Sequence, residues 1–142
     1  MEKVNTNETA ARLRRAVTRL NRRLRHSSLG GISPTQASML ESIDKRTNPS
    51  LGDLAEAEQM KPPSVTRIAQ SMQEAGLILC VVDAEDRRCT RVQLSPLGRK
   101  ELAAIRRRKT EFLESKLLAL SKDDQYKAVE LVDLLERLLE KP

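Results

Sequence analysis

Two consecutive prolines, Pro62 and Pro63, constrain the fold of this chain more than any other feature of its sequence. Proline costs about 3 kcal/mol inside a helix but almost nothing in its first turn, where the backbone N–H has no partner anyway. A helix is therefore expected to begin at Pro62 or Pro63. Apolar residues then recur three or four positions apart, from Val65 through Ile68 to Met72, so one face of this helix is expected to be buried.

The segments before the prolines predict two more helices. In SPTQASMLESIDKR (33–46), Ser33 suits the N-cap and Pro34 occupies the first helical position, whereas LGDLAEAEQ (51–59) is typical of a short helix. The residues expected to face inward are Met39, Leu40 and Ile43 in the first segment, and Leu51, Leu54 and Ala55 in the second.

A change of hydrophobic period follows the proline-initiated helix. Gly76 ends the helical pattern as a C-terminal glycine does, and the period then falls from about 3.6 to about 2. Residues 77–83 and 90–94 are β-branched, apolar runs that flank the charged residues 84–89, which predicts a hairpin with a charged tip. A hairpin after a helix–turn–helix is a winged arrangement. The expected fold is therefore mainly α with a small two-stranded β wing.

Three further helices are expected in the terminal parts of the chain. Residues 9–26 and 121–139 each carry an apolar stripe, and residues 95–120 predict a helix of roughly 35 Å at 1.5 Å per residue. The stripes consist of Leu13, Val17, Leu20 and Leu24 in the first helix, and of Val129, Val132, Leu135 and Leu139 in the last. Lone helices with such stripes must bury them somewhere, and two-fold packing of two chains does so.

The net charge of the chain indicates which class of molecule it binds. The formal net charge is +6 and the sequence pI is about 9.7, which suggests a polyanion such as nucleic acid or an acidic membrane surface. The N-terminus has no apolar signal segment and no run approaches transmembrane length, so we expect a cytoplasmic protein that does not use a membrane. Its two cysteines do not make a secreted disulfide framework.

The start of the proline-initiated helix has the chemistry of a DNA-reading element. A helix–turn–helix lays its second helix in the major groove with its N-terminal residues toward the bases. Ser64 and Thr66 are short enough to let the backbone approach phosphate, and free N–H groups of the first turn would add a favourable partial charge. Arg67 can reach guanine or a phosphate, and Lys61 is placed to meet the DNA backbone. The expected DNA-binding residues here are Lys61, Pro62, Pro63, Ser64, Thr66, Arg67 and Gln70; the alternative is an ordinary surface helix.

The hairpin tip adds a second candidate contact. Arg87 and Arg88 lie at the end of a projecting element, where an arginine can enter the narrow minor groove. An aspartate can hold such an arginine extended by a bidentate pair, and we expect Asp86 to hold Arg88 in this way. The expected wing contacts are Asp86, Arg87, Arg88 and Arg91, and the alternative is a solvated charged turn.

In this order, the motifs resemble the winged helix–turn–helix core of MarR-type transcription regulators. They are LA (54–55), SVTRI (64–68), EAGLI (74–78), DAEDRR (83–88) and VQLSPLGR (92–99), and the flanking helices extend the resemblance over nearly the whole chain. The resemblance implies a homodimeric repressor that binds a pseudo-palindromic DNA operator and is released by a small ligand or by thiol oxidation. It also implies dimerisation helices at 1–30 and 97–142 around a DNA-binding lobe at 31–96, in one continuous folded unit.

Other classes of function are less well supported. The chain has one histidine and lacks GxSxG, P-loop and HExxH spacings, so we expect no enzyme; without a Cys/His cluster, we expect no metal and no cofactor. Cys80 is expected to be buried and inert, whereas Cys89 lies beside Arg88 and Arg91, which favour a thiolate. A thiol-redox switch at Cys89 is therefore one alternative. The others are an architectural DNA-binding protein without an effector and a helical scaffold that binds proteins.

Overall fold

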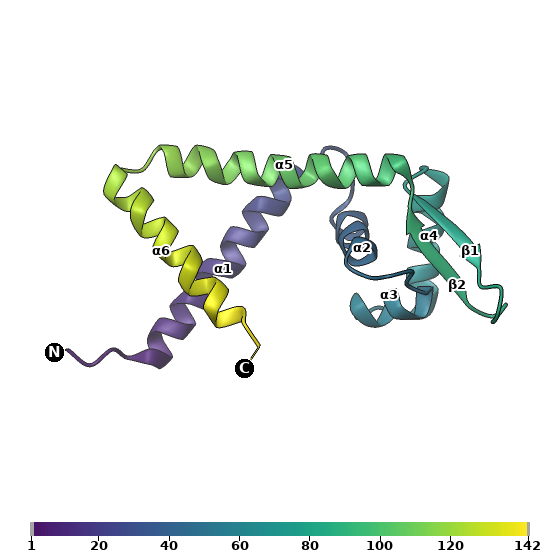
Figure 1. The fold of residues 1–142 in the computed structure, drawn as a ribbon, viewed down its shortest axis with the longest axis horizontal. Helices are drawn as coiled ribbons and strands as arrows, with labels where there is room; N and C mark the ends of the chain where they lie inside the picture. Colours follow the sequence, from purple (N-terminus) through teal and green to yellow (C-terminus); the bar gives the residue numbers. More distant parts are fainter. Residues whose placement is uncertain (1, 142) are drawn as a thin grey trace.

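The structure, a computed structural model, describes residues 2–141. Within them, the chain forms helices and one two-stranded antiparallel sheet, as the sequence predicts. In chain order the elements are α1 (Thr6–Ser28), α2 (Pro34–Asp44), α3 (Leu51–Ala57), α4 (Pro62–Glu74), β1 (Ile78–Val82), β2 (Thr90–Leu94), α5 (Pro96–Leu118) and α6 (Lys122–Leu139). Figure 1 shows α5 spanning the molecule, with α2, α3, α4 and the hairpin at its N-terminal end and α6 at its other end.

Serine side chains start four of the helices. Ser33, Ser50, Ser95 and Ser121 each accept a hydrogen bond from the backbone N–H three residues ahead, which satisfies a donor that the first helical turn leaves without a partner. The range expected for α1, 9–26, is too short. The helix begins at Thr6 because Asn5 caps it by accepting a hydrogen bond from the N–H of Glu8 at 3.1 Å.

The hairpin pairs β1 with β2 in the register Ile78 with Leu94 through Val82 with Thr90. The loop before α3 extends this sheet, because the N–H of Val92 donates to the carbonyl of Pro49 at 2.9 Å and Ser50 forms a bridge with Arg91. The wing is therefore fixed along one edge to the helix–turn–helix, a connection that the sequence pattern did not predict.

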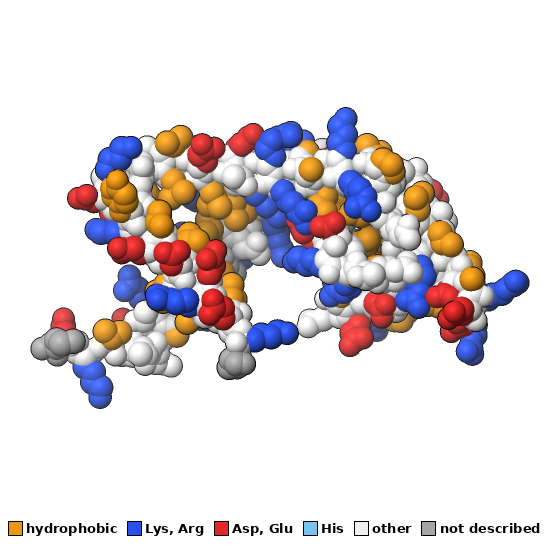
Figure 2. Space-filling view, in the orientation of Figure 1, with side chains coloured by type: hydrophobic (Ala, Val, Ile, Leu, Met, Phe, Trp, Pro, Cys, Tyr) orange, Lys and Arg blue, Asp and Glu red, His pale blue; other side chains and the backbone are white. Residues whose placement is uncertain are grey.

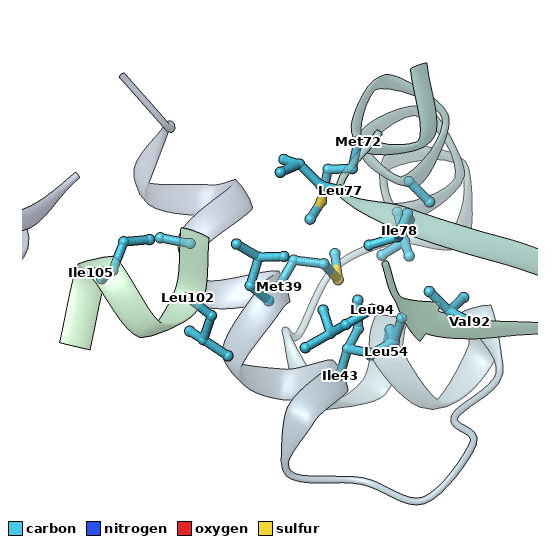
Figure 3. Packing of buried hydrophobic residues seen from close by; sticks show 14 of the residues in the cluster. Met39, Ile43, Leu54, Met72, Leu77, Ile78, Val92, Leu94, Leu102 and Ile105 are labelled. Carbon is cyan, nitrogen blue, oxygen red and sulfur yellow. The ribbon is translucent and has the colours of Figure 1, made fainter. Parts of the chain in front are cut away.

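The hydrophobic core lies between α2, α3, α4, the hairpin and the start of α5, as Figure 3 shows. Met39, Leu54 and Met72 are completely enclosed, in agreement with the helical spacing of the sequence. Leu102 and Ile105 bring α5 into the same cluster. The long helix is thus anchored to the lobe by its N-terminal part.

Polar contacts hold α5 against α2 and α1. The guanidinium of Arg106 lies 2.7 Å from Glu41 and 2.8 Å from Asp44, both on α2. Arg108 donates a hydrogen bond to the carbonyl of Ser28 at 3.1 Å, at the C-terminal end of α1. Carbonyls at a helix C-terminus carry partial negative charge, so a cation is favoured there. These contacts orient α5 relative to both neighbouring helices.

The terminal helices leave their apolar stripes uncovered. Among the described residues α6 has none that is buried, and Val129 and Leu139 are 60% and 83% exposed. Figure 2 shows hydrophobic side chains gathered along the inner side of the angle between α5 and α6. None of the described helices combines the length and the apolar character that crossing a membrane requires.

Candidate nucleic-acid interface

The second helix of the helix–turn–helix begins where the prolines predict. Pro62 and Pro63 occupy the first two positions of α4, and Lys61 is the N-cap with extended backbone at φ −70° and ψ 143°. The side chain of Lys61 makes no capping hydrogen bond and is exposed, so its ammonium is available to an anion. Val65, Ala69 and Met72 are buried, which turns the opposite face of α4 to the solvent.

The first turn of α4 corrects one expectation. Proline has no N–H, so neither Pro62 nor Pro63 can donate a hydrogen bond to a phosphate. The N–H of Ser64 donates to the carbonyl of Lys61 at 3.0 Å, and that of Val65 donates to the same carbonyl at 3.2 Å. The predicted free N–H donors are therefore absent from these positions. The prolines set where the helix starts, and phosphate recognition must come from side chains.

The side chains expected to reach DNA from α4 differ in their surroundings. Arg67 and Gln70 are exposed, whereas Ser64 is half-buried. The hydroxyl of Thr66 is exposed but donates to the carbonyl of Pro62, one turn back in the same helix, at 3.0 Å. The proton of the Thr66 hydroxyl is thus already used in the free protein, whereas the exposed side chains of Arg67 and Gln70 can donate to a ligand.

Asp83 organises the wing loop. Its carboxylate accepts hydrogen bonds from the N–H groups of Glu85 at 2.8 Å and Asp86 at 3.3 Å. Its own N–H donates to the carbonyl of Cys89 at 2.8 Å, which closes the loop. Asp83 was not among the site residues expected from the sequence. The available signal was its place directly after a strand, because an aspartate there often accepts bonds from the backbone that follows.

Arg88 projects from the tip, but the pair expected to hold it is weak. Its Nε lies 3.4 Å from one carboxylate oxygen of Asp86, a single contact where a bidentate pair was predicted, and the Arg88 side chain is 93% exposed. The N–H of Arg88 also donates to Asp86 at 3.1 Å, so the aspartate supports the backbone as well. Arg87 is exposed next to it. Figure 2 shows acidic and basic side chains side by side at this tip.

Arg91 occupies a different position from the other wing arginines. Its Nε donates to Asp83 at 2.9 Å, its Nη1 lies 3.8 Å from Asp53 and 3.4 Å from the carbonyl of Asn48, and its side chain is only 33% exposed. In the free protein, Arg91 therefore connects the base of the wing to the start of α3, and its guanidinium is already engaged. These contacts position the wing in the free protein, and the DNA contact expected of Arg91 from the sequence stays a prediction.

These contacts also lower the pKa values of two aspartates. The hydrogen bond from Arg91, followed by those from the backbone of Glu85 and Asp86, lowers the pKa of Asp83. The pKa of Asp53 is lowered chiefly by its hydrogen bonds with Ser50, and then by the charge of Arg91. Both carboxylates therefore stay ionised down to a lower pH than an ordinary aspartate, which maintains the connection between the wing and α3 there.

The two cysteines are free and lie in different environments. Cys80, expected to be buried, is half-buried at the edge of the core, and burial raises the pKa of its thiol, which keeps the thiol protonated. Cys89 is also half-buried, and its backbone N–H donates to the carbonyl of Asp86 at 2.9 Å within the wing loop. Among the described residues, no group of three or more His, Cys, Asp or Glu side chains could hold a metal ion.

Comparison with known proteins decides the family. The profile of the MarR family matches residues 32–90. An uncharacterised HTH-type transcriptional regulator of Mycobacterium leprae is 30% identical over 132 residues, which cover 92% of each chain. The chain belongs to the MarR family. An HTH-type transcriptional regulator of Mycobacterium bovis matches this MarR-family chain to the same extent.

Solved structures agree with the fold of this MarR-family chain. A transcriptional regulator protein from Pseudomonas aeruginosa is 29% identical, with a TM-score of 0.81 over 99% of this chain and 100% of its own. A point mutant of Staphylococcus aureus MepR bound to an oligodeoxyribonucleotide is 20% identical, with a TM-score of 0.71 over 92% of this chain and 97% of its own. The winged helix–turn–helix fold predicted from the sequence is confirmed.

Family membership also defines the general function. The protein is a MarR-family, helix–turn–helix transcriptional regulator. Members of this family are DNA-binding regulators and not enzymes, which confirms the expectation that this chain catalyses no reaction. Within this chain, the exposed start of α4 and the projecting wing are the candidate elements for contact with DNA.

Proposed function

We propose that the protein is a homodimeric repressor that binds a pseudo-palindromic operator in the cytoplasm. The observation that carries this proposal is the separation of two exposed surfaces along α5. At its N-terminal end, Arg67 on α4 and Arg88 on the wing face the solvent. Toward its other end lie α1 and α6 (Figure 1), whose apolar stripes are largely exposed.

The uncovered stripes support the homodimer. Leu118 and Val129 are 70% and 60% exposed, and they line a hollow of about 300 Å³ between α5 and α6 together with Leu117, Ala128 and Val132. Monomeric proteins rarely leave a contiguous apolar surface of this kind in water. A second copy that packs its own α1, α5 and α6 against this surface would bury both sets at once.

Two paired lobes would suit a two-fold symmetric DNA site. Recognition helices that enter successive major grooves lie about 34–36 Å apart, one turn of the duplex. In each half-site, Arg67 would contact base edges or phosphate in the major groove, and Arg88 would enter the adjacent minor groove. The MepR mutant that shares this fold is bound to an oligodeoxyribonucleotide, which supports DNA as the partner here.

Release by a small ligand is the regulatory part of the proposal. One chain alone offers a hollow of about 190 Å³ between α1, α2 and α5, lined partly by Arg25, Glu41 and Lys109. Ligand pockets usually measure about 300–1,000 Å³, so we propose that a second copy completes this site. Its basic side chains favour an anionic effector over a neutral one.

Selection of bound genomic fragments tests the proposal most directly. A repressor should enrich fragments with a two-fold symmetric motif, and should prefer that motif over random duplex about a thousandfold or more at fixed salt. An architectural protein would show no such preference. Sedimentation of the free protein should give the mass of two chains, and a monomer would refute the dimer.

The thiol-redox alternative has its own test. Cys89 lies in the wing loop, so oxidation there would displace the elements around Arg88. Peroxide should release a redox-controlled repressor from the selected operator, and Cys89→Ser should abolish that release. The proposed ligand-controlled repressor should instead remain bound after peroxide treatment.

A further inference from the structure

The net positive charge of this chain does not lie on the segment that contains α4 and the wing. Residues 31–96, which include α4 and the wing, carry seven Lys and Arg against nine Asp and Glu. Residues 1–30 carry eight Lys and Arg against two Asp and Glu, which equals the whole net charge of +6. When a protein binds duplex DNA without regard to sequence, most of the affinity comes from cations that neutralise phosphates. The reading lobe alone is poorly equipped to supply it.

The charge of the N-terminal segment is arranged in a line along α1. Arg12, Arg15, Arg19 and Arg22 follow one another at spacings of three, four and three residues, so they lie on one face of the helix. All four are exposed. This face is opposite the apolar stripe of α1, so the line can remain open when the stripe is covered. We call these four residues the arginine ridge.

The arginine ridge has no internal partner. Among the described residues, no carboxylate forms an ion pair with any arginine of α1, although Arg106 on α5 is paired with two carboxylates of α2. Like charges three or four residues apart on a helix repel one another and destabilise it. The ridge therefore lowers the stability of α1 in the free protein, and a bound anion would remove that cost.

The length and the chemistry of the ridge suit a DNA backbone. Ten residues of helix separate Arg12 from Arg22, which is about 15 Å along the axis. A duplex carries one phosphate charge per about 1.7 Å, so a stretch of this length presents about nine phosphates. Apart from His26, the basic residues of α1 are all arginines, whose planar guanidinium forms bidentate bonds with phosphate, and none is a lysine.

We propose that the arginine ridge binds the phosphate backbone of duplex DNA without reading sequence, outside the stretch contacted by α4 and the wing. The ridge lies on α1, whereas the wing is at the far N-terminal end of α5 (Figure 1). It therefore supplies affinity at a separate place on the protein. This inference depends on the proposed function only in taking DNA as the anion, and a dimer would carry two such ridges.

The test compares two variants with the same loss of charge. In the ridge variant Arg12, Arg15, Arg19 and Arg22 are all replaced by Gln. In the control variant Lys100, Arg107, Lys122 and Arg137, which are exposed on α5 and α6, are replaced by Gln. Glutamine is about as good a helix former as arginine, so both should stay folded, which circular dichroism checks.

The measurement is the salt dependence of binding to a duplex of random sequence. Fluorescence anisotropy between about 50 and 200 mM salt gives the slope of log K against log salt, to which each neutralised phosphate adds about 0.9. The ridge variant should lower the magnitude of this slope by about 3, and the control variant by less than about 1. Equal losses in the two variants would overturn the proposal.

Two other outcomes would assign the ridge to another partner. If the ridge variant sedimented as a monomer while the control stayed dimeric, the ridge would serve self-association. If it kept the wild-type slope on DNA but lost binding to phosphatidylserine vesicles, the ridge would serve a membrane surface. Failure of the proposed function is distinguishable, because the absence of a selectable operator would leave the result on random duplex intact.

Discussion

At the scale of single residues, two arginines of the wing have different roles although they lie only three positions apart in the sequence. Arg88 is 93% exposed and makes one contact with Asp86 at 3.4 Å, so little restrains it. Arg91 is 33% exposed and contacts both Asp83 and Asp53. We propose that Arg88 enters a groove of the DNA, whereas Arg91 holds the hairpin from which Arg88 projects.

Removing Arg91 should raise the pKa of Asp83, because the hydrogen bond from Arg91 is the largest cause of its lowered value. A carboxyl with a lowered pKa in the folded state adds stability above its unfolded pKa of about 3.9 and loses it as pH falls through the folded pKa. In Arg91→Ala the wing should therefore lose this contribution. NMR titration of the Asp83 carboxyl measures the shift. Arg88→Ala should leave it unchanged, and an unmoved Asp83 in Arg91→Ala would contradict the assignment.

Replacing Arg67 should reduce sequence discrimination. Arg67→Ala is expected to cost roughly 1–3 kcal/mol on the selected operator and to relax specificity, because a base contact is lost. Lys61→Ala should instead weaken binding to all duplexes alike and lower the salt slope by about one unit. Binding titrations of both variants on operator and random duplex distinguish these effects. Equal weakening on every sequence by Arg67→Ala would show that Arg67 contacts phosphate only.

At the scale of secondary-structure elements, three of them meet at the start of α5. The N–H of Ser95 donates to the carbonyl of Leu77 at 3.1 Å, just before β1. Its side chain bonds the carbonyl of Gly76, at the end of α4. Gly98, in the first turn of α5, lies so close to Leu77 that a Cβ would overlap the Leu77 carbonyl oxygen. The recognition helix, the wing and α5 are therefore fixed to one another at this junction.

Gly98→Ala should destabilise the lobe, because its methyl group would meet rigid backbone. Forcing extra atoms into a packed site typically costs about 1–3 kcal/mol. Gly52→Ala is a matched control, since a Cβ there would only make an ordinary contact of 3.6 Å with Ser50. Alanine is favoured over glycine in a helix by up to about 1 kcal/mol, so the control should be neutral or stabilising. Urea unfolding of both variants measures this, and equal stability would refute the close packing.

At the scale of the whole molecule, α5 joins two regions with different packing. Its N-terminal part contributes Leu102 and Ile105 to the core, whereas its C-terminal part carries Leu118 in the solvent. The described core cluster includes no residue of α6. The lobe has a core of its own, whereas the terminal helices keep exposed apolar surfaces that the proposed second chain would cover.

A charge placed on the apolar face of α6 should dissociate the proposed dimer. Val129 lines the hollow between α5 and α6, so Val129→Lys would require burial of a charge in the interface. Tyr126 is 71% exposed and lies outside that hollow, so Tyr126→Lys is the control. Sedimentation should give one chain for the first variant and two for the second. Tight operator binding should be lost with the dimer, and a dimeric Val129→Lys would place the interface elsewhere.

The sequence by itself determined the elements and the family. Proline and serine positions set the starts of α2, α4 and α5, and the change of hydrophobic period after Gly76 predicted the hairpin. These features are local, because a helix start depends on a few neighbouring backbone groups and a period depends on one face of one element. The inward-facing residues Met39, Leu40 and Ile43 were predicted correctly for the same reason.

Only the tertiary structure decided which charged residues of distant segments contact one another. Asp53 and Arg91 are distant in the chain, and no local pattern indicates that they lie 3.8 Å apart. The first turn of α4 was misjudged because its N–H groups depend on actual backbone geometry, which directs the N–H of Ser64 to Lys61. The exposure of the arginine ridge likewise required knowing what packs beside α1. Contacts between distant segments arise from packing, which a sequence pattern does not contain.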